Sequence, residues 1–114
     1  MSRGDLLGAF EQLVLVALIR LGDGAYGMTV RREIEERTGR PTSLGAVYAT
    51  LDRLESKGYV TSYGAPATPE RQGRAKRFFR IALSGCRALE ETRSTFELMY
   101  RDLPPLPFPG RGVP

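Results

Sequence analysis

The sequence has no histidine and no tryptophan, and Cys86 is its only cysteine. With one cysteine and no histidine, the chain can form neither an intrachain disulfide nor the usual Cys/His zinc site. General acid–base catalysis near neutral pH usually uses histidine, and thiol catalysis needs a base beside the cysteine. We therefore expect no metal, no cofactor and no enzyme activity, with carboxylate or lysine chemistry as the alternative that this composition leaves open.

The sequence also lacks a long hydrophobic run. No stretch approaches the ~20 apolar residues of a membrane-spanning helix. The N-terminus lacks the basic start, apolar middle and small-residue cleavage site of a signal peptide. We expect a cytoplasmic protein that does not bind membranes, with Cys86 in the reduced state.

The chain is short. Its 114 residues, 41% of them hydrophobic, suffice for one core but not for a second domain of ordinary size. Small cores leave part of their apolar surface uncovered, and disulfides, metals or partner subunits usually compensate. Since the first two are not expected here, the sequence favours an oligomer.

Positive charge is concentrated in one segment. The net charge is +4, and residues 71–80 contain five basic side chains and no acidic one. These side chains are Arg71, Arg74, Lys76, Arg77 and Arg80. The rest of the chain contains twelve basic and thirteen acidic side chains, a net charge of −1. This distribution is typical of a segment that contacts nucleic acid.

Two helices are expected before Gly39. Residues 6–21 are apolar almost all round, which predicts a buried helix ended by Gly22; a buried strand over residues 13–19 is the alternative. A turn at residues 23–25 precedes a second, amphipathic helix that ends at Gly39.

A third helix follows directly. Pro41 blocks continuation of the second helix, Ser43 is placed to cap the third, and Gly58 follows its end near Lys57. Its predicted core-facing stripe consists of Leu44, Val47, Tyr48, Leu51 and Leu54. The opposite face is small and polar, with Gly45, Ala46, Ala49, Thr50 and Arg53. A large partner could therefore approach the backbone of this helix closely.

The second half predicts a hairpin, a helix and a tail. Residues 59–63 and 78–83 read as strands joined by a basic, glycine-rich segment. Ser84 is placed to cap a last helix that runs to about Asp102. That helix has an apolar seam of seven-residue period, formed by Leu89, Thr92, Phe96, Met99 and Leu103. The proline-rich residues 104–114 are expected to be extended or disordered.

This order of elements predicts a mainly α fold with a small β-hairpin, a winged helix-turn-helix. We expect it in residues 1–83, with a dimerisation helix in residues 84–103 and the tail in residues 104–114. The third helix would enter the major groove of duplex DNA while the hairpin reaches flanking phosphates. Each feature alone has an ordinary explanation, since an amphipathic helix is usually core and a basic run usually a solvated surface. Their combination favours DNA binding.

Three segments resemble the PadR family of transcriptional regulators. The third helix, with SLGAVYATLDRLESKG at residues 43–58, is the most specific of them. AYG at residues 25–27 and RFFRI at residues 77–81 support it. The resemblance covers about residues 7–100. The family often has two tyrosines where this chain has Phe78 and Phe79, and a threonine at Ala82, so a hairpin tyrosine contact does not carry over and the cap shifts to Ser84.

The resemblance implies a homodimer, joined by the last helix against the partner's first helix, that represses transcription at a palindromic operator. The candidate DNA contacts are Tyr26, Thr42, Ser43, Gly45, Ala46, Tyr48, Ala49, Thr50, Arg53, Arg71, Arg74, Lys76 and Arg77, with Arg53 as the best base reader. The candidate dimer contacts are Leu13, Leu89, Thr92, Phe96, Met99 and Leu103. A small aromatic effector, which the family commonly binds, could contact Phe10, Phe96, Met99 and Tyr100.

Other interpretations of these features exist. Residues 22–27 satisfy the pattern G-x-G-x-x-G, but a dinucleotide site would also need parallel strands. A winged helix could instead dock an acidic protein through its basic hairpin, whereas the narrow major groove of A-form RNA would not admit the third helix. Cys86 is expected to be a small half-buried residue, with an intersubunit redox switch as the alternative.

Overall fold

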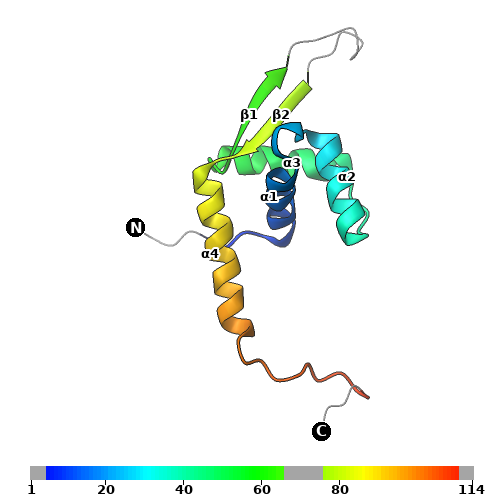
Figure 1. Ribbon diagram of the computed structural model, residues 1–114, viewed down its shortest axis with the longest axis vertical. Coiled ribbons are helices and arrows are strands. Elements are labelled where there is room, and N and C mark those ends of the chain that lie inside the picture. Colours follow the sequence, from blue (N-terminus) through cyan, green and yellow to red (C-terminus); the bar gives the residue numbers. More distant parts are fainter. Residues whose placement is uncertain (1–4, 66–75, 111–114) are drawn as a thin grey trace.

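Three helices, a two-stranded hairpin and a final helix follow one another along the chain (Figure 1). The computed structural model describes residues 5–65 and 76–110. Its elements are α1 (Ala9–Leu21), the 3-10 turn η1 (Gly22–Gly24), α2 (Gly27–Thr38), α3 (Leu44–Ser56), β1 (Val60–Ala65), β2 (Lys76–Ile81) and α4 (Leu83–Tyr100). The expected mainly helical fold with a small hairpin is confirmed.

The first helix is the centre of the molecule. α1 packs against α2, α3 and β2, and its Val14, Leu15 and Leu18 are buried. It begins at Ala9, not at residue 6, because the Glu11 carboxylate accepts the backbone N–H of Gly8 and caps the helix there. The alternative of a strand over residues 13–19 is therefore wrong. Because η1 follows a helix and not a strand, the dinucleotide motif also has no structural basis.

The connection between α2 and α3 has the helix end and the helix cap that the sequence predicts. Gly39 ends α2 in the left-handed conformation, with a φ of 70° that glycine adopts readily. Ser43 caps α3 by accepting the backbone N–H of Ala46 at 3.0 Å. Both ends of the turn are thus fixed by local chemistry.

The hairpin is antiparallel, with Val60 opposite Ile81 and Ala65 opposite Lys76. Each strand lies nearer the tip of the hairpin than predicted. Leu83 already belongs to α4, and the backbone carbonyl of Tyr59 accepts a hydrogen bond from the N–H of Ala82, which precedes α4. The Phe79 N–H donates to the carbonyl of Ala25 at 2.9 Å, and the Phe79 ring is fully buried. The hairpin is therefore joined to the core at the turn before α2.

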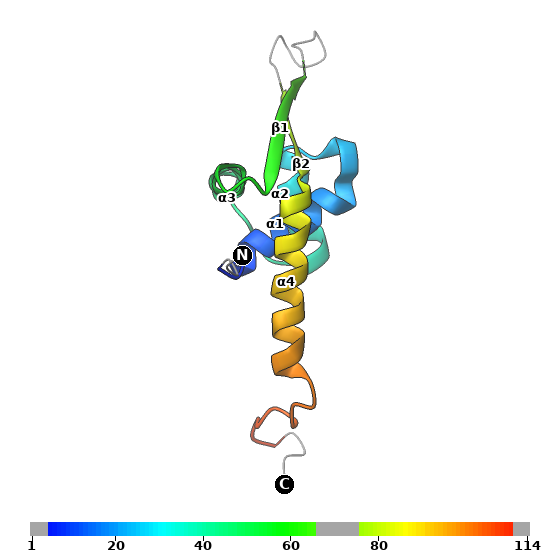
Figure 2. The ribbon, with the colours of Figure 1, turned by 90° about the vertical axis from the view of Figure 1, so that its left-hand side faces the viewer.

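The last helix begins without a side-chain cap. Its N-cap is Ala82, so the prediction that Ser84 caps α4 is wrong; the Ser84 hydroxyl donates to the carbonyl of Gly58 at 2.6 Å. Cys86 is exposed and not half-buried. The first half of α4 packs on the body through Ala88 and Leu89, and the second half extends away from it in both views (Figures 1 and 2).

Beyond α4 the chain continues without helix or strand as far as residue 110. Leu106 and Phe108 in this stretch are about half exposed. None of the described helices is long and apolar enough to cross a lipid bilayer.

Gly85 allows α4 to approach the hairpin closely. A methyl group at this residue would stand 2.3 Å from the carbonyl oxygen of Tyr59, whereas one at Gly45, also in the first turn of a helix, would meet nothing within 4 Å. We expect Gly85→Ala to lower the free energy of unfolding by about 2 kcal/mol. Gly45→Ala, the matched control, should raise it by about 0.5–1 kcal/mol. Chemical denaturation measures both, and equal effects of the two substitutions would contradict the close approach.

Candidate nucleic-acid interface

The predicted outer face of α3 is exposed. Gly45, Ala46 and Ala49 are all exposed, while Val47, Leu51 and Leu54 on the other side of the helix are buried in the core. Figure 2 shows α3 end-on at the edge of the molecule. The face formed by Gly45, Ala46 and Ala49 therefore presents no bulky side chain of its own to solvent.

One residue of α3 lies on the side opposite to the one predicted, since Thr50 was expected to face DNA but is only 3% exposed. Tyr48, predicted at the edge of the core stripe and as a DNA contact, is 36% exposed, and its ring lies over Gly27, where a methyl group would stand 2.3 Å from the ring carbon Cζ. The buried side of α3 thus includes Thr50, and Gly27 leaves room for the Tyr48 ring beside α2. Leu44 is half-buried.

The residues before α3 are held in place by hydrogen bonds. Thr42 is half-buried, and its backbone N–H donates to the Glu35 carboxylate at 2.8 Å. Ser43 is exposed, although its hydroxyl oxygen caps α3. Both predicted contact residues thus lie beside the start of the exposed face.

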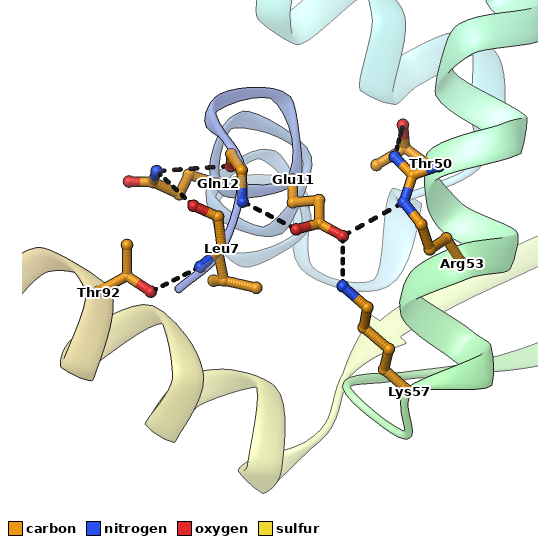
Figure 3. A network of polar contacts seen from close by, with 8 residues as sticks. Leu7, Glu11, Gln12, Thr50, Arg53, Lys57 and Thr92 are labelled. Atoms are coloured by element: carbon orange, nitrogen blue, oxygen red, sulfur yellow. Dashed lines mark hydrogen bonds and ion pairs between the residues drawn. The ribbon is translucent and has the colours of Figure 1, made fainter. Parts of the chain in front are cut away.

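The structure adds an acidic residue, Glu11, that sequence reasoning missed. Its carboxylate oxygen Oε2 accepts hydrogen bonds from Lys57 Nζ at 2.9 Å and from Arg53 Nε at 3.3 Å (Figure 3). Arg53 Nη2 also donates to the Thr50 hydroxyl at 3.3 Å. Arg53, predicted to be the best base reader, is therefore directed along α3 toward α1. The signal in the sequence was a single acidic residue within an apolar helix.

Hydrogen bonds and charge lower the pKa of the Glu11 carboxyl. Burial of the group would raise its pKa, but the N–H of Gly8 and the cations Lys57 and Arg53 outweigh this effect, so the pKa lies below the ordinary value. Glu11 therefore remains a carboxylate at neutral pH.

The residues just before α1 also contact α4. The backbone N–H of Leu7 donates to the buried hydroxyl of Thr92 at 3.1 Å, and Gln12 Nε2 donates to the carbonyl of Leu7 at 3.3 Å (Figure 3). Thr92 was predicted to contact a second subunit, but it is 1% exposed and packs within its own chain. Residues 7–12 thus connect α4 to α3.

Most of the described basic side chains of the hairpin have acidic partners. Arg77 pairs with Glu55 and, at 3.2 Å, with Asp52, both on α3. Arg80 lies 3.7 Å from Asp23. Arg77 thus remains a predicted phosphate contact, with a side chain that is 46% exposed, but acidic residues distant in sequence fold against it and share its charge. Arg71 and Arg74 lie outside the described residues.

Aromatic rings connect the hairpin to the start of α2. The Tyr26 ring meets Phe78 edge to face at a centroid distance of 5.6 Å, and the Tyr63 ring stacks on Phe78 at 5.6 Å. Lys76 Nζ lies 4.1 Å from the centre of the Tyr26 ring. Two predicted contacts, Tyr26 and Lys76, are thus side by side where β2 passes the start of α2.

The predicted dimer contacts are divided between the core and the surface. Leu13 and Leu89 are partly buried against the core of their own chain. Phe96, Met99 and Leu103 are exposed. These three side chains, together with Tyr100, leave the second half of α4 with an apolar surface that nothing in the described part of the protomer covers.

The predicted effector residues do not form one site within the protomer. Phe10 lines an open groove of about 770 Å³ beside Pro41 and Ser43. Phe96 and Tyr100 line another hollow of about 340 Å³ with Gln12, Arg93 and Glu97. Met99 lines neither of these two hollows. In the described ranges, no three His, Cys, Asp or Glu side chains are grouped closely enough to hold a metal ion.

Comparisons with known proteins identify relatives of this arrangement. The family model described as "Transcriptional regulator PadR-like family" matches residues 14–91. The fold is similar to that of a transcriptional regulator from Clostridium thermocellum, with 25% identity, a TM-score of 0.67, and 79% of this chain and 84% of that chain covered. No curated protein matches the chain significantly.

Two further solved structures support the fold. A PadR family transcription regulator from Clostridium difficile R20291 is 23% identical, with a TM-score of 0.67 and coverage of 81% of this chain and 91% of that chain. F93 from STIV, a winged-helix DNA-binding protein, is 20% identical, with a TM-score of 0.64 and coverage of 86% and 98%. The predicted winged-helix fold is confirmed.

The environment of Glu11 predicts a stability that depends on pH. A carboxyl group whose pKa is lower in the folded chain than in the unfolded chain stabilises the fold when the pH is above its unfolded-state pKa. This stabilisation is lost as the pH falls through its folded-state pKa. We expect Glu11→Gln to lower the free energy of unfolding by about 2 kcal/mol at pH 7. Denaturation at several pH values should show this gap shrinking below the ordinary carboxyl pKa of 4.5.

The matched control for this experiment is Glu33→Gln. Glu33 pairs with Arg37 one turn away on α2, and the Arg37 side chain is 57% exposed. Such a pair contributes about 0.5 kcal/mol or less. A gap between wild type and Glu11→Gln that stays constant from pH 7 to pH 3 would show that the charge of Glu11 does not stabilise the fold.

Proposed function

The chain belongs to the PadR-like family of transcriptional regulators, and from this premise we propose that it is a cytoplasmic homodimer that binds a palindromic DNA operator and represses transcription. The observation that carries the proposal is the exposed, small-residue face of α3. Because its opposite side is buried in the core, this face is available to a large partner. Residues 1–83 would bind DNA, residues 84–103 would join the subunits, and residues 104–114 have no assigned role.

The shape of α3 fits the major groove. That groove is about 12 Å wide and admits an α-helix. With no side chain at Gly45 and only methyl groups at Ala46 and Ala49, the helix backbone can approach base edges closely. Alanine methyl groups recognise thymine by contact with its methyl group. We therefore expect an operator with A·T pairs opposite Ala46 and Ala49, and hydrogen bonds from Thr42 and Ser43 near the start of the helix.

The hairpin would bind phosphates beside this groove. Lys76, held over the ring of Tyr26, is the described hairpin cation that no acidic side chain neutralises. Arg71 and Arg74 add charge nearer the tip in the sequence. Pairing of Arg77 and Arg80 with acids of the same chain leaves little free charge at the base, which argues against docking of an acidic protein there.

The exposed half of α4 supports the homodimer. Phe96, Met99 and Tyr100 recur at three- and four-residue spacing and therefore share one side of α4, and Leu103, which follows the helix, is also exposed. On α1, Val16 and Ile19 are also exposed and apolar, and they are candidates for the partner's contact surface. A two-fold dimer would present two α3 helices to successive major grooves about 34 Å apart.

A small aromatic effector would fit best near this dimer contact. The hollow between α1 and α4 combines the rings of Phe96 and Tyr100 with the polar groups of Gln12 and Arg93. A second subunit would cover its open side. An effector releases DNA only if it binds the non-binding arrangement of the dimer more tightly.

A negative side chain on the outer face of α3 tests the DNA contact. We expect Ala49→Asp to weaken operator binding by about 100-fold or more, because a carboxylate in the groove is repelled by the phosphates and prevents close approach. Ser94→Asp adds the same charge on α4 and should leave binding unchanged. Fluorescence anisotropy with fragments selected from random duplex DNA measures both. Equal affinities of the two variants would exclude α3 as the recognition helix.

A charge on the exposed end of α4 tests the dimer. Met99 is 75% exposed and Leu83, at the other end of the helix, is 66% exposed. We expect Met99→Glu to halve the mass measured by sedimentation equilibrium, since a buried unpaired carboxylate is costly at an interface. Leu83→Glu should leave the mass unchanged. A monomeric wild-type protein, or a dimer that survives Met99→Glu and not Leu83→Glu, would contradict the proposed interface.

A further inference from the structure

Arg53 and Lys57 form a fixed pair of cations through their shared contact with Glu11, and we call these three residues the Glu11 cluster. The guanidinium and the ammonium both donate to the same oxygen, Oε2, at 3.3 and 2.9 Å (Figure 3). The Glu11 side chain is 8% exposed, whereas those of Arg53 and Lys57 are 52% and 44% exposed. The anion is thus inside and the cations face solvent.

The cluster retains a positive charge. Two cations share one carboxylate, which leaves a net charge of +1. Among the described residues, the other ion pairs are neutral or negative: Arg37 with Glu33, Arg80 with Asp23 and Arg93 with Glu97 are balanced. Arg77 lies between two acids, Asp52 and Glu55. Of the described ion-pair groups, the Glu11 cluster alone attracts anions.

The cations of the Glu11 cluster lie along one edge of the exposed face of α3. Successive residues of a helix are about 100° apart, so Arg53 and Lys57 lie along one edge of the exposed face, next to Ala46 and Ala49. Asp52 and Glu55, which contact the hairpin, lie along the other edge. A helix in the major groove has one phosphate strand at each edge. The hairpin serves one strand, and the Glu11 cluster lies where the other strand would pass.

We propose that Arg53 and Lys57 bind phosphates of the DNA strand opposite the hairpin, and that Glu11 is the positioning residue of this site. The proposal rests on the proposed function of duplex DNA binding. Arg53 has five N–H donors and Lys57 three, and the contacts with Glu11 and Thr50 use only some of them. Glu11 holds both side chains extended beside the groove, so less conformational entropy is lost when a phosphate binds.

This assignment gives Arg53 a role different from base reading. A cation on a phosphate strengthens binding to all sequences alike, whereas a base reader strengthens binding to the operator alone. The two roles are therefore separated by comparing operator DNA with an unrelated duplex.

The first test is Lys57→Gln, which leaves Arg53 on Glu11 and so preserves the fold. The substitution removes one lysine–phosphate contact per subunit. For a dimer, this loss makes the slope of log affinity against log salt concentration shallower by about 1.8 and lowers the affinity about 60-fold at 0.1 M salt. The loss should be equal on operator and on unrelated DNA. The control Arg87→Gln removes one exposed cation from the first half of α4 and should leave the slope unchanged. An unchanged slope for Lys57→Gln, or an equal change for Arg87→Gln, overturns the proposal.

The second test isolates the role of Glu11 by a double-mutant cycle. If Glu11 positions Lys57, then Lys57→Gln costs much less affinity, about threefold or less, when Glu11→Gln is already present. Additive losses, measured on variants that thermal unfolding shows to be folded, would mean that Glu11 does not position the site.

The outcomes for this site and for the function are separate. Wild-type protein that shows no preference for any selected duplex fragment would refute the proposed function. Wild-type protein that binds its operator, with Lys57→Gln at the wild-type salt slope, would refute this inference alone.

Discussion

The packing of α3 on α1 determines the rest of the interface. Burial of Val47, Leu51 and Leu54 decides which side of α3 faces the core, and so which side remains exposed. Apolar contacts are not directional, and they alone would allow α3 to turn by small angles. The Glu11 carboxylate, which contacts residues one turn apart on α3, adds the directional restraint. Shape and charge on this helix thus have a common origin in α1.

The distribution of charge in the folded protein differs from that in the sequence. Residues 71–80 contain five cations and no acid, but folding brings Asp52 and Glu55 to Arg77 and Asp23 to Arg80. These acids belong to α3 and to the turn after α1, so no local count reveals the pairing. The Arg77 pairs join the hairpin to α3, and the Arg80 pair joins it to η1. Among the described residues, Lys76 has no acidic partner and the Glu11 cluster keeps a net positive charge, so the described part of the hairpin is less basic than its sequence indicates.

The fold was predictable where local chemistry decides it. The cap at Ser43, the left-handed Gly39 and the period of α3 are each visible in the sequence and present in the structure. The errors arose where a distant contact decides. The Tyr48 ring packs against α2 because Gly27, 21 residues away, leaves room for it, and Thr50 turns inward beside Arg53. The ion pairs of Arg53 and Arg77 could not be predicted, because their acidic partners are separated from them in sequence. Glu11 and Lys57 were missed for the same reason.

The segment before α1 connects α3 to α4. Leu7 donates to Thr92 on α4, and Glu11, one turn later, contacts Arg53 and Lys57 on α3. The first half of α4 is thereby packed against the rest of the protomer. The second half has an exposed apolar surface, and a helix with such a surface is only marginally stable in water without a packing partner. If that surface is covered by a second copy, the separation of the two α3 helices is set by short, hydrogen-bonded contacts and not by a flexible linker. A displacement of α4 would then have to break the contact at Thr92 or move residues 7–11, and with them the cations beside α3.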